Sequence, residues 1–403
     1  MRGCDRPLSE AYDVALLDLD GVVYVGHRPV PGAPEALAKA RATGPSVGRR
    51  AGAGNRGGDR HGTREGVDDV RGCDRPLSEA YDVALLDLDG VVYVGHRPVP
   101  GAPEALAKAR AAGQRLAFVT NNASRTPGAV AALLTGMGVP ADAGDVVTSA
   151  QAAARLLAER LPAGSKVLVV GGTGLRHALY AHGLVPVSTA AERPAAVVQG
   201  YDPHLSYGLI AQGAQAVLQG ALFVASNGDL TIPGGDGPPQ PGNGSLMQVI
   251  KAATGVDPIV TGKPRRPLHQ ESIIRTGARN PLIVGDRLDT DIEGAHNGGA
   301  DSMLVFTGVT DPLTVLTAGP RHRPTYLAAD LGGLLVPHPA VRADDDGHRC
   351  GGWTARWAGA KIELIGEGDP WDGLRALCGA AWRTEAPVAA EAVADALERL
   401  DLP

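Results

Sequence analysis

The chain has 403 residues, a formal net charge of −6 and 44% apolar residues, which is ordinary for a soluble globular protein of two or three domains. With 38 basic against 44 acidic residues, it lacks the basic surplus that is typical of a nucleic-acid-binding protein. It also lacks the run of roughly 18 apolar residues that would span a membrane. We therefore expect neither a nucleic acid nor a membrane as a partner.

The chain repeats its own beginning. Residues 2–44 recur as residues 71–113, and the two copies differ only in Thr43 against Ala112. Two copies do not make a solenoid, since repeat arrays need at least three units to bury a continuous core. We interpret the repeat as a recent duplication or an error in the gene model.

We therefore expect residues 1–44 to be a duplicate of the start of the catalytic core. Residues 45–70, which follow, are rich in Gly and Arg and almost free of apolar residues. Such a composition predicts a disordered linker. A solvated linker is favoured over an RNA-binding arm.

From residue 71, apolar runs alternate with helical patterns, which predicts a parallel α/β sheet with short crossovers. The expected strands are Val83–Leu88, Arg115–Thr120, Lys166–Val170, Ala195–Gln199, Leu222–Ala225, Pro281–Val284 and Ser302–Val305. The expected helices are Pro103–Ala112, Pro127–Thr135, Ala150–Arg160, Leu175–His182, Tyr207–Leu218 and Asp291–Asn297.

All four tryptophans lie at the end of the chain, after a polar stretch (337–352) that we expect to be a loop and a domain boundary. Two strands (354–357 and 361–365) and two helices should follow it. This predicts a small α+β extension over residues 340–403.

The four cysteines form no CxxC pair, and two of them, Cys4 and Cys73, are equivalent positions of the repeat. This argues against a disulfide framework or a zinc site and favours a reducing compartment. The start MRGCDRPLSEAYD has no apolar segment of the kind that a secretory signal needs. We expect a cytoplasmic protein.

Two acidic residues, Asp87 and Asp89, follow the first expected strand of the core. Residues two apart on a strand face the same side, so both carboxylates can point into one site. Gly90 then allows a tight turn. A calcium loop could begin in the same way, but it needs further oxygen ligands and a Glu at its twelfth position, whereas the segment here continues as VVYV.

Three further polar segments lie at expected strand ends or in loops. Thr120 and Asn121 follow one strand and predict an anion cradle or a helix cap. Lys263 lies in Thr-Gly-Lys-Pro, which lacks the spacing and the hydroxyl residue of a phosphate loop. Asp286 and Asp291 follow the strand PLIV, at the end where open α/β sheets bind ligands.

In this order the four segments resemble the motifs of the haloacid dehalogenase phosphatases, over about residues 80–333. The resemblance implies a Rossmann-like parallel core (71–148 and 246–335) with an inserted α/β cap domain (149–245). The cap segments VVQGYDPHLSYGL and FVASNGDLTIP resemble the large-cap subclass, which includes p-nitrophenyl phosphatases and NagD-like enzymes. The extension after the core is similar to that of actinobacterial members.

The resemblance also implies roles. Asp87 would be the nucleophile that forms an aspartyl-phosphate, and Asp89 the general acid and base. Thr120, Asn121 and Lys263 would bind the phosphate and offset its charge.

The cofactor implied is Mg²⁺, which prefers carboxylates together with phosphate and water oxygens. Asp87, the backbone carbonyl of Asp89, and Asp286 would be its ligands, and Asp291 would orient them. Asn227 and Asp229 would belong to a cap loop that faces the substrate.

The expected function is hydrolysis of a small phosphorylated metabolite, with glycerol 3-phosphate and p-nitrophenyl phosphate as candidate substrates. Two alternatives stay open: a phosphomutase of the same fold, and a non-catalytic binding protein inactivated by the duplication. A homodimer is also open.

Asp18 and Asp20 of the first copy duplicate Asp87 and Asp89. Thr120 lies 31 residues after Asp89 and 100 residues after Asp20. Loop-closure entropy favours the nearer copy by only about 1 kcal/mol. The second copy also leads directly into the next strand, so we expect Asp87 to be the working residue.

Overall fold

The computed structural model describes residues 24–25, 28–29, 70–234, 237–383 and 388–402. The chain divides into two compact units, Met1–Arg64 and Glu65–Pro403. Most of the first repeat copy and the expected linker up to residue 69 lie outside the described residues. Val70, which we assigned to the linker, is 2% exposed and packs in a hydrophobic core, so that boundary is wrong by one residue.

The described residues of the first unit form one small ribbon, in which β1 (Tyr24–Val25) pairs antiparallel with β2 (Arg28–Pro29). The second repeat copy forms the same ribbon from β4 (Tyr93–Val94) and β5 (Arg97–Pro98). The register is identical, because Tyr pairs with Pro and Val with Arg in both. The local sequence therefore suffices to determine this ribbon.

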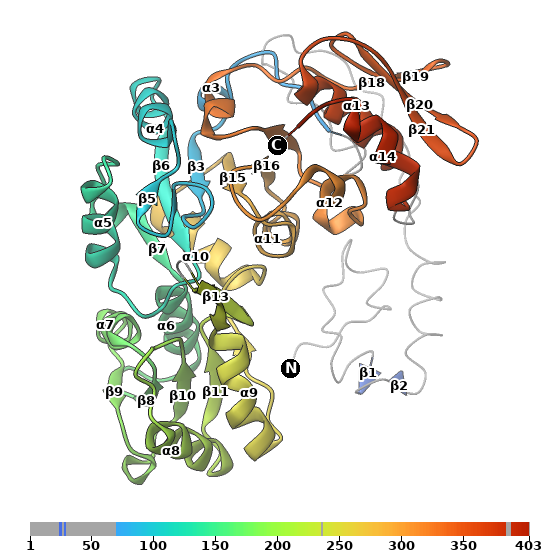
Figure 1. Cartoon of the computed structure of the whole chain (residues 1–403). Helices are drawn as coiled ribbons and strands as arrows, with labels where there is room; N and C mark the ends of the chain where they lie inside the picture. Colours follow the sequence, from blue (N-terminus) through green and yellow to red (C-terminus); the bar gives the residue numbers. More distant parts are fainter. Residues whose placement is uncertain (1–23, 26–27, 30–69, 235–236, 384–387, 403) are drawn as a thin grey trace, which may run out of the picture. The chain divides into compact units, whose positions relative to one another are not determined.

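A six-stranded parallel sheet, the first sheet, forms the core of the second unit (Figure 1). Its spatial order is β17 (Tyr326–Ala328), β16 (Asp301–Val305), β15 (Pro281–Gly285), β3 (Val83–Leu86), β6 (Arg115–Thr120) and β7 (Val146–Thr148). The central strand β3 is buried along its whole length, as expected of a continuous apolar run in a parallel sheet. Its alternate residues pack into two separate cores, one on each face.

Helices cover both faces of the first sheet. They are α3 (Leu77–Ala80), α4 (Ala102–Ala111), α5 (Pro127–Gly136), α10 (Arg266–Thr276), α11 (Glu293–Gly298) and α12 (Pro312–Leu316). In the register of the sheet, Leu86 pairs with Val284 on one side and with Phe118 on the other. The segments that follow β3, β6 and β15 therefore emerge at the same edge.

A second parallel sheet has the order β14 (Ile259–Val260), β11 (Leu222–Ala225), β10 (Ala196–Gln199), β8 (Lys166–Val170) and β9 (Val185–Val187). Figure 1 shows it below the first sheet, with helices on both of its faces. Those helices are α6 (Ser149–Arg160), α7 (Thr173–Ala181), α8 (Tyr207–Leu218) and α9 (Asn243–Thr254). A short ribbon of β12 (Thr231–Gly234) and β13 (Gly237–Pro241) lies beside α9.

The second sheet extends beyond residue 245, where we expected the inserted domain to end. Strand β14 pairs with β11, and α9 packs on α8. This extension could not be predicted, because β14 is only two residues long and a strand of that length has no periodicity to detect.

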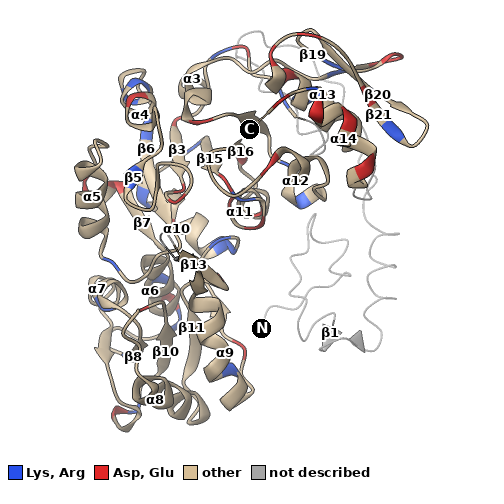
Figure 2. Cartoon of the chain, in the orientation of Figure 1, with Lys and Arg blue, Asp and Glu red and all other residues tan. Residues whose placement is uncertain are grey.

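The C-terminal part forms a four-stranded antiparallel sheet of β18 (Arg342–Asp344), β19 (Gly347–Cys350), β20 (Trp353–Ala358) and β21 (Lys361–Gly366), followed by α13 (Pro370–Ala381) and α14 (Ala390–Glu398). Residues 337–352 are thus not a loop, since β18 and β19 form a hairpin there. The turn residues Asp345 and Asp346 precede Gly347, whose φ of +137° favours glycine. Acidic residues of α14 are marked red in Figure 2, and one of them, Asp395, pairs with Lys361 of β21.

This C-terminal part shares a hydrophobic core with the first sheet. Trp382 is 2% exposed and donates its indole N–H to the carbonyl of Val315 in α12 at 3.1 Å. Arg375 of α13 donates to the carbonyl of Leu327 in β17 at 2.7 Å. The predicted fold class is confirmed: a parallel α/β core, an inserted α/β unit and an α+β extension. Within the described ranges, no helix combines the length and the apolar content that a bilayer crossing requires.

Candidate active site

Asp87 follows β3 directly. Its backbone N–H donates to the carbonyl of Val284 on β15 at 2.8 Å, which continues the pairing of the two strands. The side chain is 14% exposed. Burial raises the pKa of Asp87 above its ordinary value, and the charge of Lys263 opposes that rise. The carboxylate therefore depends on nearby positive charge to remain ionised.

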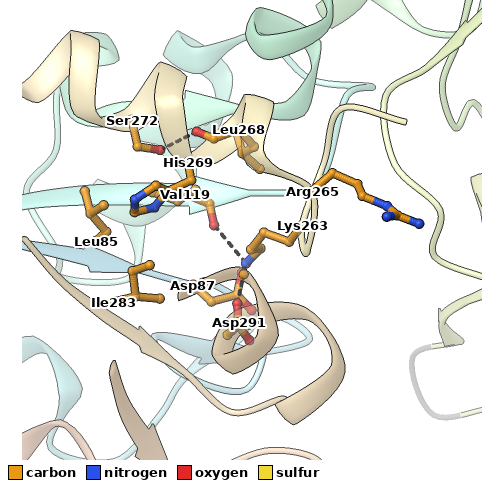
Figure 3. A pocket seen from close by; sticks show the side chains of 11 residues that line it. Leu85, Asp87, Val119, Lys263, Arg265, Leu268, His269, Ser272, Ile283 and Asp291 are labelled. Atoms are coloured by element: carbon orange, nitrogen blue, oxygen red, sulfur yellow. Dashed lines mark hydrogen bonds and ion pairs between the residues drawn. The ribbon is translucent and has the colours of Figure 1, made fainter. Parts of the chain in front are cut away.

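Lys263 supplies this charge. Its Nζ lies 2.5 Å from Oδ1 of Asp87 and 2.7 Å from Oδ1 of Asp291, and it donates to the Val119 carbonyl at 3.3 Å. Figure 3 shows the lysine reaching the two carboxylates, while Arg265 points away from them. Burial alone would lower the pKa of Lys263, but the two carboxylates outweigh burial and raise it. Lys263 is thus a fixed cation at the edge of the first sheet.

Three carboxylates meet at this edge. Oxygens of Asp87, Asp286 and Asp291 all lie within 4.8 Å of one another. Burial and the neighbouring Asp291 and Asp87 charges raise the pKa of Asp286 to about 7. Burial likewise raises the pKa of Asp291 to about 6, against the effect of Lys263. One lysine does not balance three carboxylates, so the cluster favours a further cation.

The donor set fits a hard divalent cation. Asp286 is 1% exposed, and its Oδ1 has no hydrogen-bond partner among the described residues. Both oxygens of Asp291 are engaged, one by Lys263 and the other by the backbone N–H of Arg287 at 3.3 Å. Asp286 and Asp87 are therefore the carboxylates that can offer an oxygen to a cation, with Asp291 behind them.

A segment that we did not single out, 307–310, holds Asp286 in place. The backbone N–H of Val309 donates to Oδ2 of Asp286 at 2.8 Å, and the hydroxyl of Thr310 donates to its carbonyl oxygen at 2.5 Å. A Cβ on Gly308 would lie 2.0 Å from Oδ2. The sequence Thr-Gly-Val-Thr follows strand β16 after a single residue, Phe306, so its position after a strand was the signal that could have found it.

Asp89 lies two residues beyond Asp87 and its side chain is exposed. Gly90, at φ +83°, turns the chain so that its N–H donates to the carbonyl of Tyr93 at 2.8 Å. Desolvation of the carboxylate by the surrounding protein atoms raises the pKa of Asp89, and the charges of Lys263 and Arg125 oppose the rise. An exposed acid with a raised pKa is suited to exchanging protons with water or a ligand.

Asn121 links the polar segments to one another. Its Oδ1 accepts the backbone N–H of Lys263 at 2.8 Å, and its carbonyl accepts the hydroxyl of Ser149 at 2.6 Å. Thr120 is 4% exposed, and its hydroxyl oxygen accepts the N–H of Asn122 at 3.0 Å. The structure thus brings Thr120 and Asn121 to the same sheet edge as Asp87, as the order of the strands predicts.

Asn227 and Asp229, predicted as a cap loop that faces substrate, contact Asn121. The amide of Asn227 donates to the Asn121 carbonyl at 2.7 Å, and Asn227 is 4% exposed. The amide of Asn121 donates to both oxygens of Asp229. These contacts connect the second sheet to the first; a contact of either residue with substrate stays a prediction.

A cavity of about 30 Å³ lies beside Asp87, Lys263 and Asp291, enough for about one water molecule. Leu85, Ile283 and the ring of His269 also line it (Figure 3). Burial and the nearby Arg266 lower the pKa of His269, so its ring stays neutral.

Comparison with known families gives three matches. Residues 84–185 match the haloacid dehalogenase-like hydrolases, and residues 260–334 match the HAD-hydrolase-like family. These two ranges contain Asp87, Asp89, Lys263, Asp286 and Asp291, whereas Asp229 lies between them. Residues 350–402 match the GCN5-related N-acetyltransferase like domain.

Known proteins are similar over most of the second unit. D-glycerol 3-phosphate phosphatase of Mycobacterium tuberculosis is 40% identical over 329 residues, which cover 77% of this chain and 89% of the relative. The crystal structure of the glycerol phosphate phosphatase of M. tuberculosis with magnesium matches with a TM-score of 0.73 at 40% identity, over 82% of this chain and all of that one. A structure of a putative p-nitrophenyl phosphatase from Bacillus subtilis matches with a TM-score of 0.56 at 35% identity, over 63% and 95%.

Proposed function

Since the chain belongs to the haloacid dehalogenase-like hydrolases and is a phosphoric monoester hydrolase, we propose that Asp87 is its nucleophile. The observation that supports this is the position of the carboxylate, 2.5 Å from Nζ of Lys263 and beside the carboxylates of Asp286 and Asp291. A carboxylate nucleophile attached to a rigid central strand needs little reorganisation before it reacts.

In the first step, an oxygen of Asp87 attacks phosphorus and the bond from phosphorus to the ester oxygen breaks. Asp89 gives its proton to that leaving oxygen. In the second step, Asp89 takes a proton from a water molecule, and the water oxygen displaces Asp87 from phosphorus. Free phosphate, the Asp87 carboxylate and protonated Asp89 result.

Lys263 stabilises the charge that collects on the transferring group, because its ammonium is buried and fixed between carboxylates. Asn121 fixes the backbone of Lys263 through its Oδ1. Thr120, at the end of the neighbouring strand, is proposed to bind the phosphate with Asn121 and Lys263.

We propose Mg²⁺ as the cofactor, held by Asp87, Asp286 and the backbone carbonyl of Asp89. A relative was solved with magnesium, and the unpartnered Oδ1 of Asp286 suits such an ion. When bound, Mg²⁺ would neutralise the carboxylates and polarise the phosphate oxygens. Asp291 would hold Lys263 and the backbone of Arg287 in place, because its two carboxylate oxygens accept hydrogen bonds from them.

For substrate, we propose glycerol 3-phosphate, because the similar protein of M. tuberculosis is named for that ester and its match covers 77% of this chain. The inserted unit around the second sheet is proposed to act as a cap. Its loop with Asn227 and Asp229 contacts Asn121, so the base of the cap touches the phosphate-binding segment.

Neither open alternative is favoured, because the relatives reported above are phosphatases. A cytoplasmic location and a homodimer stay predictions.

The test measures phosphate release from glycerol 3-phosphate and from p-nitrophenyl phosphate, with and without Mg²⁺. We expect Asp87→Asn to abolish turnover and Asp18→Asn, its counterpart in the first repeat copy, to retain it. Turnover by Asp87→Asn that disappears only in the double variant would show that the first copy can replace the second. Absence of Mg²⁺-dependent turnover on either substrate in the wild-type protein would contradict the proposal.

A further inference from the structure

The segment that holds Asp286 also touches the C-terminal extension. Segment 307–310 grips the carboxylate and the backbone carbonyl of Asp286, as described above. Thr307 donates in addition to the carbonyl of Gly90 at 2.5 Å, on the turn that follows Asp87 and Asp89. Any shift of this segment would therefore move both Asp286 and the turn at Gly90, which lie on two sides of the proposed cation site.

Residues on either side of the segment, Phe306 and Val315, contact tryptophans of the extension. At its start, the ring of Phe306 packs against the ring of Trp371, with centroids 4.9 Å apart and planes tilted by 42°. Beyond its end, Val315 accepts the indole N–H of Trp382 at 3.1 Å and is itself fully buried. Figure 1 shows α13, which begins at Pro370, beside α12.

Trp371 is itself held firmly. Its backbone N–H donates to the side chain of Asp369, the N-cap of α13, at 2.8 Å. The carbonyl of Asp369 accepts the indole N–H of Trp353 at 2.9 Å. The ring that Phe306 meets thus belongs to a rigid helix start and not to a free side chain.

We propose that Trp371 is a positioning residue for the hydrolase site: through Phe306 it fixes segment 307–310, and thereby Asp286, in the place that binds the divalent cation. The extension is then a part of the metal site's support and not an independent appendage. This inference rests on the proposed function, because it assumes that Asp286 binds Mg²⁺.

The test titrates Mg²⁺ by calorimetry into the full-length wild-type protein, Trp371→Ala, Trp371→Phe and Trp357→Ala. Trp357 is a matched control, since it lies in the same extension, donates to Ala380 and is 41% exposed. We expect Trp371→Ala to weaken Mg²⁺ binding by about tenfold, at the lower end of what partners behind metal ligands contribute. Trp371→Phe should restore most of the affinity, and Trp357→Ala should bind as the wild type does.

Two further readouts separate positioning from loss of fold. At saturating Mg²⁺, kcat of Trp371→Ala should recover towards the wild-type value, because the ion then occupies the loosened site. If Trp371→Ala does not fold, as judged by circular dichroism, Phe306→Leu removes the same ring contact at a smaller cost in volume and should show the same loss of affinity.

The inference is overturned if the wild type binds Mg²⁺ and the folded variant, Trp371→Ala or Phe306→Leu, binds it equally well. In that case the proposed function stands. If the wild type itself binds no Mg²⁺, the proposed metal site fails, and the inference fails with it.

Discussion

The side-chain amide of Asn121 donates hydrogen bonds to both carboxylate oxygens of Asp229, at 3.0 and 3.1 Å. The same side chain accepts the backbone N–H of Lys263 through its Oδ1. One amide therefore ties the loop after β11, in the second sheet, to the lysine at the edge of the first. Burial raises the pKa of Asp229, and the hydrogen bonds from Asn121 oppose the rise.

Removing this carboxylate should disturb Lys263 at a distance. In Asp229→Ala the Asn121 amide loses both carboxylate acceptors and keeps only the Lys263 carbonyl at 3.3 Å, so its hold on Lys263 is weakened. Breaking such a charge-assisted pair costs about 1–3 kcal/mol, so kcat/KM should fall about tenfold or more. Asp229→Asn keeps an acceptor oxygen and should fall less. Steady-state kinetics decide the matter: equal activity in both variants and in the wild type would show that the contact does not position the site.

Gly308 lies against the carboxylate of Asp286, and the space admits no side chain. In Gly308→Ala the new Cβ would lie 2.0 Å from Oδ2, so the carboxylate or the segment must move. Because a displacement of about 1 Å can cost about 100-fold in rate, we expect a loss of that order in kcat/KM. Gly319→Ala is the control, since no atom lies within 4 Å of a Cβ there. If Gly308→Ala has wild-type kinetics, segment 307–310 can move to admit the Cβ without displacing Asp286.

Trp382 should be among the most costly residues to truncate. It is buried, donates to Val315, and lies beneath the guanidinium of Arg323 at 5.6 Å. Trp382→Ala should lower the free energy of unfolding by about 3–5 kcal/mol, as other large core truncations do. Trp382→Phe keeps an aromatic ring but loses the indole donor, and should cost about 1–2 kcal/mol. Urea denaturation measures both; a similar loss in the two variants would assign the effect to the hydrogen bond alone.

His338 should make the fold sensitive to mild acid. It is 2% exposed and its Nε2–H donates to the Gly333 carbonyl at 2.8 Å. Burial lowers the pKa of His338, the Gly333 contact opposes this, and the Arg375 charge adds to it. The pKa of His338 is therefore about 6.5 in the unfolded chain and lower in the folded chain, so the unfolded chain binds more protons as the pH falls below that value. The stability from neutral His338 is complete above that pH and is lost as the pH falls towards the lower folded pKa.

The matched variant is His338→Gln, whose amide can still donate to Gly333 and does not titrate in this range. Thermal unfolding at about pH 7.5 and about pH 5.5 should show a larger fall in Tm for the wild type than for the variant. Falls of equal size would exclude His338 as a source of the acid sensitivity, whatever the variant's stability at neutral pH.

Two deletions should yield nearly the same enzyme. Removing residues 1–69 leaves Val70, Arg71 and the whole described core intact, including the ion pair of Arg71 with Asp301. Removing residues 45–113 joins the first repeat copy to Gln114 and places Thr43 at the position of Ala112, which is exposed. Both proteins should match the wild type in kcat/KM, and both should gain soluble yield, because a surplus apolar sequence segment favours aggregation. An inactive 1–69 deletion would show that the first copy contributes to the active protein.

The sequence predicted some elements to the residue and missed others entirely. Strands β6, β8 and β11 and helix α8 have the predicted bounds, because their apolar runs or their cap residue Ser206 mark both ends. Helix α10 was not predicted, since its buried face carries the charged Glu271, which is paired there with Arg155 and Arg275. Such a helix has no apolar stripe that a periodicity search could detect.

The site was predictable to the extent that it consists of side chains following strands. Asp87 and Asp286 come together because the parallel strands β3 and β15 end at one edge, and Lys263 reaches them from the segment after β14 of the second sheet. The hydrogen bond from Val309 to Asp286 could not be predicted in the same way, because its donor is a backbone N–H, which every residue except proline carries. The part played by the extension was hidden for a similar reason: a ring contact between Phe306 and Trp371 depends on tertiary packing and leaves no local pattern.

The distribution of tryptophan gives this protein an optical probe of its own. All four indoles lie within the C-terminal extension, and two of them, Trp371 and Trp382, contact Phe306 and Val315, on either side of the segment that holds Asp286. The tryptophan fluorescence of the chain is therefore emitted from the extension, in part from its joint with the first sheet. A change in emission during unfolding or cation binding would report on that joint without any added label.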